Sequence, residues 1–170
     1  PNDVVSVILL RDTARVQLTA EPMDWVLYNT FVDFREWKKL RPTGVGNYLP
    51  ALDKAQELLT LGSCPLALLF FSDGRPSDQL ANQVFANKMG DIAKQFGRRL
   101  KVSCIGMSQP DEHFATLRGM VEEANAYGDI ARFERPSLNT GALSSAISTL
   151  ASSLTYSKLS MMSLKTGRPK

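Results

Sequence analysis

The sequence predicts an α/β fold: a doubly wound, mostly parallel sheet with helices on both faces and one antiparallel edge strand. Short runs that are apolar throughout alternate with segments whose apolar residues recur at helical spacing. Strands that are apolar on both sides need helices over both faces of their sheet, and helical crossovers make such a sheet mostly parallel. With 170 residues, the chain is long enough for one domain with its own core.

The N-terminal part is expected to form a hairpin and a helix. Residues 4–10 are almost wholly apolar, which is typical of a buried strand, and residues 14–18 alternate in polarity like an edge strand. Asp24 is placed to cap a helix with one apolar face, and Pro42 ends that helix. A glycine-containing loop over residues 43–47 follows.

The central part holds the most hydrophobic run of the chain. A helix is expected over residues 48–61, where apolar positions 48, 52, 55 and 59 share a face. Residues 65–71 form a buried strand that delivers Asp73 to its carboxyl end. Ser77 or Asp78 is expected to cap the next helix. The buried side of that helix is expected to carry Leu80, Val84, Ile92 and Phe96.

The C-terminal part is expected to continue the same alternation. A strand over residues 101–107 precedes a helix that begins near Asp111, and a weak strand over residues 130–133 precedes a last helix over residues 138–154. We therefore expect one domain over residues 1–155. Residues 156–170 are expected to be a basic tail rich in Ser, Met and Lys, flexible or a fraying helix.

The charge of the chain is concentrated in that tail. The net charge is +3, but the last thirteen residues carry four cations and no acid, which leaves residues 1–157 at −1. This distribution gives little support to a nucleic-acid partner or an anionic membrane. No run approaches the eighteen apolar residues of a membrane span. Cys64 and Cys104 lie at or in apolar runs and form no CxxC pair, which favours core positions and a reducing compartment, although an extracellular location is also compatible.

Few side chains are suited to catalysis. The single histidine, His113, is expected on the surface in the first turn of a helix. One histidine and two strand-buried cysteines leave few members for a Ser-His-Asp or Cys-His arrangement, and the Gly-x-Ser-x-Gly and phosphate-loop motifs are absent. We therefore expect a binding module and not an enzyme.

Residues 70–78, with the sequence FFSDGRPSD, resemble the fourth strand and the following turn of the von Willebrand factor A family. Residues 3–16 resemble the family's second and third strands, residues 42–52 its Gly-Gly-Thr-Asn loop and following helix, and residues 101–107 its fifth strand. The resemblance extends from the first residue to about Leu154. It implies a Rossmann-like, doubly wound fold and a protein-binding or scaffolding function.

The resemblance implies part of a metal site. Members of the family often hold Mg²⁺ or Mn²⁺ in a metal-ion-dependent adhesion site, whose oxygen ligands suit a hard cation. Asp73 matches the aspartate that follows the fourth strand. Gly46 stands where the family has a threonine, Thr43 could replace it only in a rearranged loop, and the Asp-x-Ser-x-Ser loop is absent. We therefore expect a degenerate site that binds either cation weakly, if at all.

A protein partner is expected at the carboxyl ends of the strands, where doubly wound sheets place their ligand loops. The expected contact residues are Gly44, Gly46, Asn47, Tyr48, Asp73, Arg75 and Asp78. An alternative is that the chain is a structural or regulatory subunit, or a fragment, of a larger enzyme or assembly. A third hypothesis is a phosphate or nucleic-acid binder that uses the basic cluster at residues 35–41, the cations Arg98, Arg99 and Lys101, and the basic tail.

The order of strands in the family predicts a missing segment. The family's sheet has the order 3-2-1-4-5-6, and residues 4–10 resemble its second strand. A central gap in place of the first strand would leave backbone groups without partners. We therefore expect an N-terminally incomplete domain, completed by a longer polypeptide or a second chain, or else a rearranged sheet in which the two neighbouring strands pair directly.

Overall fold

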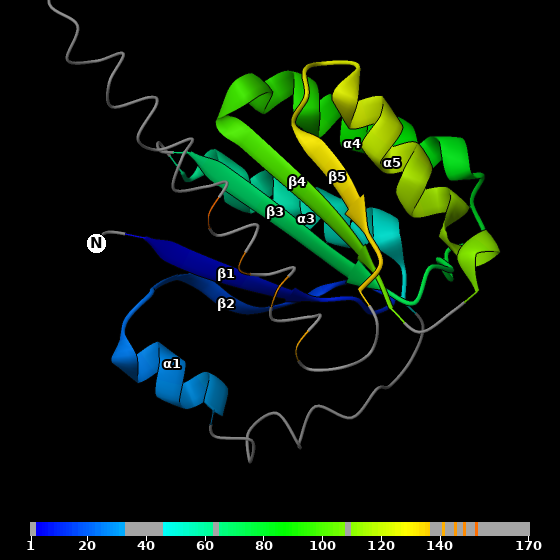
Figure 1. Ribbon diagram of the computed structural model, residues 1–170. Helices are drawn as coiled ribbons and strands as arrows, with labels where there is room; N and C mark the ends of the chain where they lie inside the picture. Colours follow the sequence, from blue (N-terminus) through cyan, green and yellow to red (C-terminus); the bar gives the residue numbers. More distant parts are fainter. Residues whose placement is uncertain are drawn as a thin grey trace, which may run out of the picture. The chain divides into compact units, whose positions relative to one another are not determined.

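The computed structural model describes residues 3–32, 46–62, 65–107 and 110–136, together with Gly141, Ser145, Ser148 and Ser152 (Figure 1). The chain divides into two compact units, and each is described by itself. The first unit comprises Pro1–Leu58 and Pro76–Gln79, and the second comprises Leu59–Arg75 and Leu80–Lys170. Both units combine strands with helices, so the predicted α/β class is confirmed.

The first unit begins with the predicted antiparallel hairpin, which forms a two-stranded sheet of its own and is not hydrogen-bonded to a parallel sheet as the expected edge strand would be. Strand β1 (Val4–Leu9) pairs with β2 (Arg15–Pro22), and Ile8 lies opposite Val16. The expectation that this first strand is buried on both faces is wrong, because no residue of β1 is buried and Val4 is exposed. Antiparallel pairs of this kind commonly keep one face in contact with water.

Two helices follow the hairpin. In α1 (Trp25–Val32), the Oδ1 atom of Asp24 accepts a hydrogen bond of 2.9 Å from the backbone N–H of Leu27, which confirms the predicted cap. The predicted continuation to Pro42 lies outside the described residues. In α3 (Tyr48–Thr60), three of the four positions of the predicted apolar face are buried, and the fourth, Leu59, is partly exposed. The buried residues of α3 are Tyr48, Ala51, Leu52 and Ala55.

The second unit contains a parallel sheet with the order β3-β4-β5 (Figure 1). Its strands are β3 (Leu66–Ser72), β4 (Leu100–Gly106) and β5 (Ala131–Glu134), and all three lie within a residue or two of the predicted ranges. Cys104 on β4 lies opposite Phe70 on β3 and Phe133 on β5. The apolar runs therefore form parallel strands, as the alternation with helices predicts.

Helices α4 (Asn82–Phe96) and α5 (Ala115–Asn125) connect these strands and pack against each other. Because the strand order follows the chain order and crossovers are right-handed, both helices lie on the same face of the sheet, as Figure 1 shows. The 3-10 helices η1 (Gly97–Arg99) and η2 (Asp111–Phe114) precede β4 and α5. The largest fully buried side chains of the unit are Phe85, Met89, Ile92, Leu100, Val102, Cys104, Ile105, Phe114, Leu117 and Met120.

The start of α4 differs from the prediction. The helix begins at Asn82, and neither Ser77 nor Asp78 caps it; Ala81 occupies the cap position without a side-chain hydrogen bond. Leu80 and Val84 are 42% and 37% exposed, so their predicted burial is also wrong, whereas Ile92 and Phe96 are buried. Asp78 does not cap α4 because its carboxylate accepts a hydrogen bond from the backbone N–H of Leu49, near the start of α3.

The described residues of the last predicted helix agree with it. Gly141, Ser145, Ser148 and Ser152 are helical and exposed, and their spacing places them on one face of a helix. The predicted apolar face, with Leu143 and Ile147, lies outside the described residues, as does the basic tail. Among the helices that the structure describes, none combines the length and the apolar composition needed to cross a membrane.

Candidate functional site

The turn after β3 presents the first candidate residue, Asp73, to solvent at the carboxyl end of the parallel sheet. The buried Ser72 hydroxyl accepts a 3.0 Å hydrogen bond from the Gly74 N–H and donates to Asp73 Oδ1 over 3.4 Å. Gly74 has φ +107°, and a Cβ atom there would lie 2.6 Å from the His113 carbonyl oxygen and 2.7 Å from the Phe114 ring. Only glycine fits this position, so the backbone of the turn can pass close to His113 and Phe114.

Arg75 contacts His113, for which the sequence predicts a surface position. Its Nη2 atom lies 2.7 Å from Nε2 of His113, which is only partly exposed. Because a guanidinium can only donate, Nε2 accepts and the imidazole carries its proton on Nδ1. The two residues are 38 positions apart. No local motif predicts this pair. The parallel pairing of β3 with β4 brings the segments after these two strands to the same edge of the sheet.

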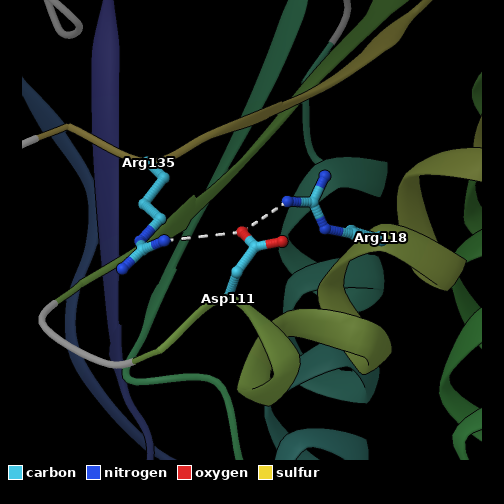
Figure 2. A network of polar contacts seen from close by, with 3 residues as sticks. All are labelled: Asp111, Arg118 and Arg135. Atoms are coloured by element: carbon cyan, nitrogen blue, oxygen red, sulfur yellow. Dashed lines mark hydrogen bonds and ion pairs between the residues drawn. The ribbon is translucent and has the colours of Figure 1, made fainter.

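A network of one acid and two arginines lies at the same edge of the sheet (Figure 2). Oδ1 of Asp111 lies 2.7 Å from Nη2 of Arg118 on α5 and 3.5 Å from Nη1 of Arg135, which directly follows β5. The Arg118 guanidinium stacks 4.3 Å from the centroid of the Phe133 ring, and that of Arg135 lies 5.6 Å from the Phe114 centroid. No pattern in the sequence marks these three polar side chains as site residues.

The other candidate residues belong to the first unit, around the N-terminus of α3. The Gly46 N–H donates to the Ser77 hydroxyl at 3.1 Å, and the Ser77 N–H donates to the Gly46 carbonyl at 3.2 Å. The Asn47 side chain donates to the Asp12 carbonyl at 3.1 Å, and Asp78 Oδ2 accepts from the Leu49 N–H at 2.9 Å. The structure thus brings together Gly46, Asn47 and Asp78, which the sequence analysis had grouped.

Tyr48 does not share their accessibility, because it is 1% exposed and its ring belongs to the core of the first unit. Gly44 and Thr43 lie outside the described residues. Oδ1 of Asn47 and Oδ1 of Asp78 are buried without a hydrogen-bond partner among the described residues. Buried acceptors usually have partners. These two oxygen atoms are therefore the chemically unsatisfied groups of this cluster.

The described residues offer little for a metal ion. They contain no group of three or more His, Cys, Asp or Glu side chains that could hold one. Asp73 supplies one carboxylate, and Gly46, which the sequence resemblance aligns with a threonine, supplies no side-chain oxygen. A single carboxylate is a poor match for Mg²⁺, which requires near-octahedral oxygen coordination.

Cys104 is not a nucleophile in the folded protein. Burial in the core raises the pKa of its thiol from 9.0 to about 12, because a thiolate would lose its hydration there. The thiolate is the reactive form, so the side chain is inert near neutral pH. The predicted core position of Cys104 is confirmed, whereas Cys64 lies outside the described residues.

Neither models of known protein families nor curated proteins match the chain. The resemblance to the von Willebrand factor A family therefore depends on the residues quoted from the sequence.

Proposed function

We propose that the chain is a protein-interaction module of the von Willebrand factor A type, with a degenerate metal-ion-dependent adhesion site and no catalytic activity. One observation carries the proposal: Asp73 is exposed on a closely packed turn at the carboxyl end of a parallel strand. In open α/β sheets, this edge is where ligands bind. The same turn carries the Ser-Asp-Gly-x-Pro signature on which the resemblance depends.

Preorganisation supports a binding role for this turn. The backbone of the turn packs closely against Phe114 at Gly74, and the contact with His113 orients the Arg75 side chain before a partner arrives. Side chains that are already ordered lose less entropy on binding. We therefore assign Asp73 and Arg75 as partner-contacting residues. The exposed part of the Gly46, Asn47 and Asp78 cluster is a second contact surface, assigned to the first unit by itself.

The finer fold is part of the same proposal. The β3-α4-β4-α5-β5 order of the second unit is a run of parallel crossovers of the kind that builds doubly wound sheets. The non-catalytic assignment is supported by the surroundings of Cys104 and His113, whose side chains would be suited to act as a nucleophile and a base. Burial keeps the Cys104 thiol neutral, and the Nε2 lone pair of His113 is engaged by Arg75.

Affinity capture from the native source tests the proposal. The tagged chain is compared with the double variant Asp73→Asn/Arg75→Gln and with the control Asp91→Asn/Arg98→Gln, which changes the same charges at exposed positions on α4 and η1. The captured protein is then purified and titrated against each variant. We expect at least tenfold weaker binding for the first variant and unchanged binding for the control. Equal affinity of a folded Asp73→Asn/Arg75→Gln variant contradicts the assignment.

A further inference from the structure

The contact between Arg75 and His113 joins a cation to a neutral acceptor. Arg75 Nη2 lies 2.7 Å from His113 Nε2. A guanidinium has N–H donors and no acceptor, so Nε2 contributes its lone pair to this hydrogen bond. The imidazole is therefore neutral, with its proton on Nδ1. A second proton, on Nε2, would leave two donors and two positive charges facing each other, and the contact would be lost.

This hydrogen bond is what restricts the Arg75 side chain. Among the ion pairs that the structure describes, none includes Arg75 or Asp73, although these opposite charges lie two residues apart on the same turn. The Arg75 side chain is exposed, and an exposed arginine without a partner has many rotamers. Without His113, no described contact would hold the guanidinium in one place.

The backbone brings the two side chains together. Arg75 follows Gly74, where a Cβ atom would lie 2.6 Å from the His113 carbonyl oxygen. The His113 N–H donates to the Pro110 carbonyl at 3.1 Å, and the next residue, Phe114, is fully buried. The segment that carries the imidazole is therefore anchored. The His113 side chain itself is partly exposed, so it can exchange a proton with solvent.

Further charged side chains lie on the segments near His113. They are Asp73 on the same turn as Arg75, Asp111 and Glu112 on η2, Arg118 on α5 and Arg135 after β5. The Asp111 carboxylate is directed to the two arginines (Figure 2). In the part of the chain that the structure describes, Arg75 is the side chain within hydrogen-bonding distance of the imidazole. A proton on Nε2 therefore acts directly on Arg75.

We propose that neutral His113 orients Arg75 for the protein partner and that protonation of His113 releases Arg75, so that binding through this turn weakens in mild acid. This inference rests on the binding role proposed above for Asp73 and Arg75 and adds its regulation. The proton comes from solvent, and histidine commonly changes its charge between pH 5 and 8. The released guanidinium samples many rotamers and can pair with Asp73, so a partner has to order it again.

The released state binds more weakly although it carries one more positive charge. The proposed contact residues are one acid and one base, so a complementary partner presents one positive and one negative group. A charge on His113 repels one of these groups and attracts the other, and the two effects oppose each other. The loss of order in Arg75 has no such compensation. We expect about two- to tenfold weaker binding at pH 5 than at pH 7.5, the effect of immobilising one long side chain.

The first test determines which ring nitrogen carries the proton. His113 is the single histidine of the chain, so its ring signals need no further assignment. Long-range ¹H–¹⁵N spectra of the full chain, prepared without a histidine tag, distinguish the two neutral tautomers. We expect the proton on Nδ1 at pH 7.5, because Arg75 donates to Nε2. A neutral ring with its proton on Nε2 overturns the proposal.

The second test measures the release of Arg75 by ¹³C relaxation of its Cδ methylene group. We expect the order parameter of Arg75 to exceed that of Arg98 at pH 7.5 and to fall to the Arg98 value at pH 5. Arg98 is the matched control, because it is an exposed arginine on η1, which precedes β4. Its order should not change with pH. Unchanged order of Arg75 between the two pH values overturns the proposal.

Two variants of His113 identify the titrating group. His113→Gln supplies an amide oxygen that accepts a hydrogen bond but does not titrate, so Arg75 should be equally ordered at pH 7.5 and pH 5. His113→Leu removes the acceptor, so Arg75 should be mobile at both. The same pH dependence in His113→Gln as in the unmodified chain overturns the proposal. Circular dichroism checks folding, and if His113→Leu does not fold, the tautomer and the His113→Gln comparison still decide.

These measurements use the chain alone, so they separate this inference from the proposed function. An Nε2–H tautomer together with weaker partner binding by Asp73→Asn/Arg75→Gln overturns the release of Arg75 and leaves the proposed function. A pH-dependent Arg75 together with full partner affinity of that double variant supports the release and removes the proposed function.

Discussion

Replacing Gly106 with alanine tests the packing at the carboxyl end of β4. A Cβ atom at this position would lie 2.7, 2.8 and 2.9 Å from three carbons of the Phe114 ring, whereas ordinary van der Waals contact begins at 3.4 Å. The ring would have to retreat by about 0.7 Å, the difference between these distances. Phe114 is fully buried and its ring lies 5.5 Å from that of Phe133, so the space for this movement is lacking.

The change in the free energy of unfolding of Gly106→Ala follows from two opposing effects. Overpacking a buried site costs about 1–3 kcal/mol, whereas loss of glycine's freedom in the unfolded chain returns about 0.4–1 kcal/mol. The steric effect is larger, so the free energy of unfolding should fall by about 1–2 kcal/mol. For a chain of this size, that corresponds to a decrease in Tm of about 2–8 °C.

Thermal unfolding followed by far-ultraviolet circular dichroism measures the effect, with Gly119→Ala as the control. Gly119 lies inside α5, and the nearest atom to a Cβ there is 4.0 Å away, at Ala86. The same chemical change should therefore stabilise the protein by about 0.5–1 kcal/mol at position 119, because alanine is the better helix former. Opposite signs at the two glycines are the expected result.

An unchanged or higher Tm for Gly106→Ala would refute this reasoning. A double-mutant cycle with Phe114→Leu locates the cause. If the clash is with the Phe114 ring, the penalty of Gly106→Ala should be smaller by about 1 kcal/mol in the Phe114→Leu background, as expected for residues in contact. Additive penalties would place the clash elsewhere.

Three further predictions concern a cap, a thiol and a metal. Asp24→Ala should lower stability by about 1 kcal/mol and speed hydrogen exchange in α1, because the Leu27 N–H loses its acceptor, whereas Asp24→Asn should retain most of the cap; equal exchange in both variants would contradict this. In a Cys64→Ser background, Cys104 should resist thiol reagents at neutral pH. Its pKa is raised from 9.0 to about 12, so the stability that the neutral thiol contributes is complete below pH 9. Between pH 9 and about 12, the free energy of unfolding should decline by about 1.4 kcal/mol per pH unit. Denaturant titrations should not find this slope in Cys104→Ala. Calorimetric titration with Mn²⁺ should show no one-site isotherm in the micromolar range, because Asp73 offers a single carboxylate; a well-defined isotherm would overturn the degenerate assignment.

The regular elements were predictable because hydrophobic periodicity determines which side of each element is buried. The face formed by Tyr48, Leu52 and Ala55 is buried as predicted, and the apolar runs around Phe70 and Cys104 are parallel strands. The start of α4 was not predictable from local signals. Asp78 is a residue type that often caps helices, but its carboxylate accepts a hydrogen bond from the Leu49 N–H, 29 residues earlier in the chain. Local capping rules do not identify such a distant donor.

In the candidate site, too, the position of a residue on its element was predictable, whereas its distant partners were not. The place of Asp73 at the end of a buried strand follows from the run before it, and the structure confirms its exposure there. The partners of the loop residues depend on which strands lie side by side. The contact of Arg135 with Asp111 forms between segments that follow β5 and β4, and only the pairing of these strands brings them together. A single sequence contains no local signal for such a pairing.

The Phe114 ring has a consequence for how the carboxyl edge of the second unit moves. It packs against Gly74 after β3, Gly106 at the end of β4, and Phe133 on β5. The ends of three strands therefore pack against one buried ring, and movement of the Asp73 turn should disturb the segment that carries Asp111. Motions in these loops should be concerted, so a partner bound at the Asp73 turn would also stiffen the segment that carries Asp111. Binding there should then slow amide hydrogen exchange after β4 as well, although the partner would not touch that segment.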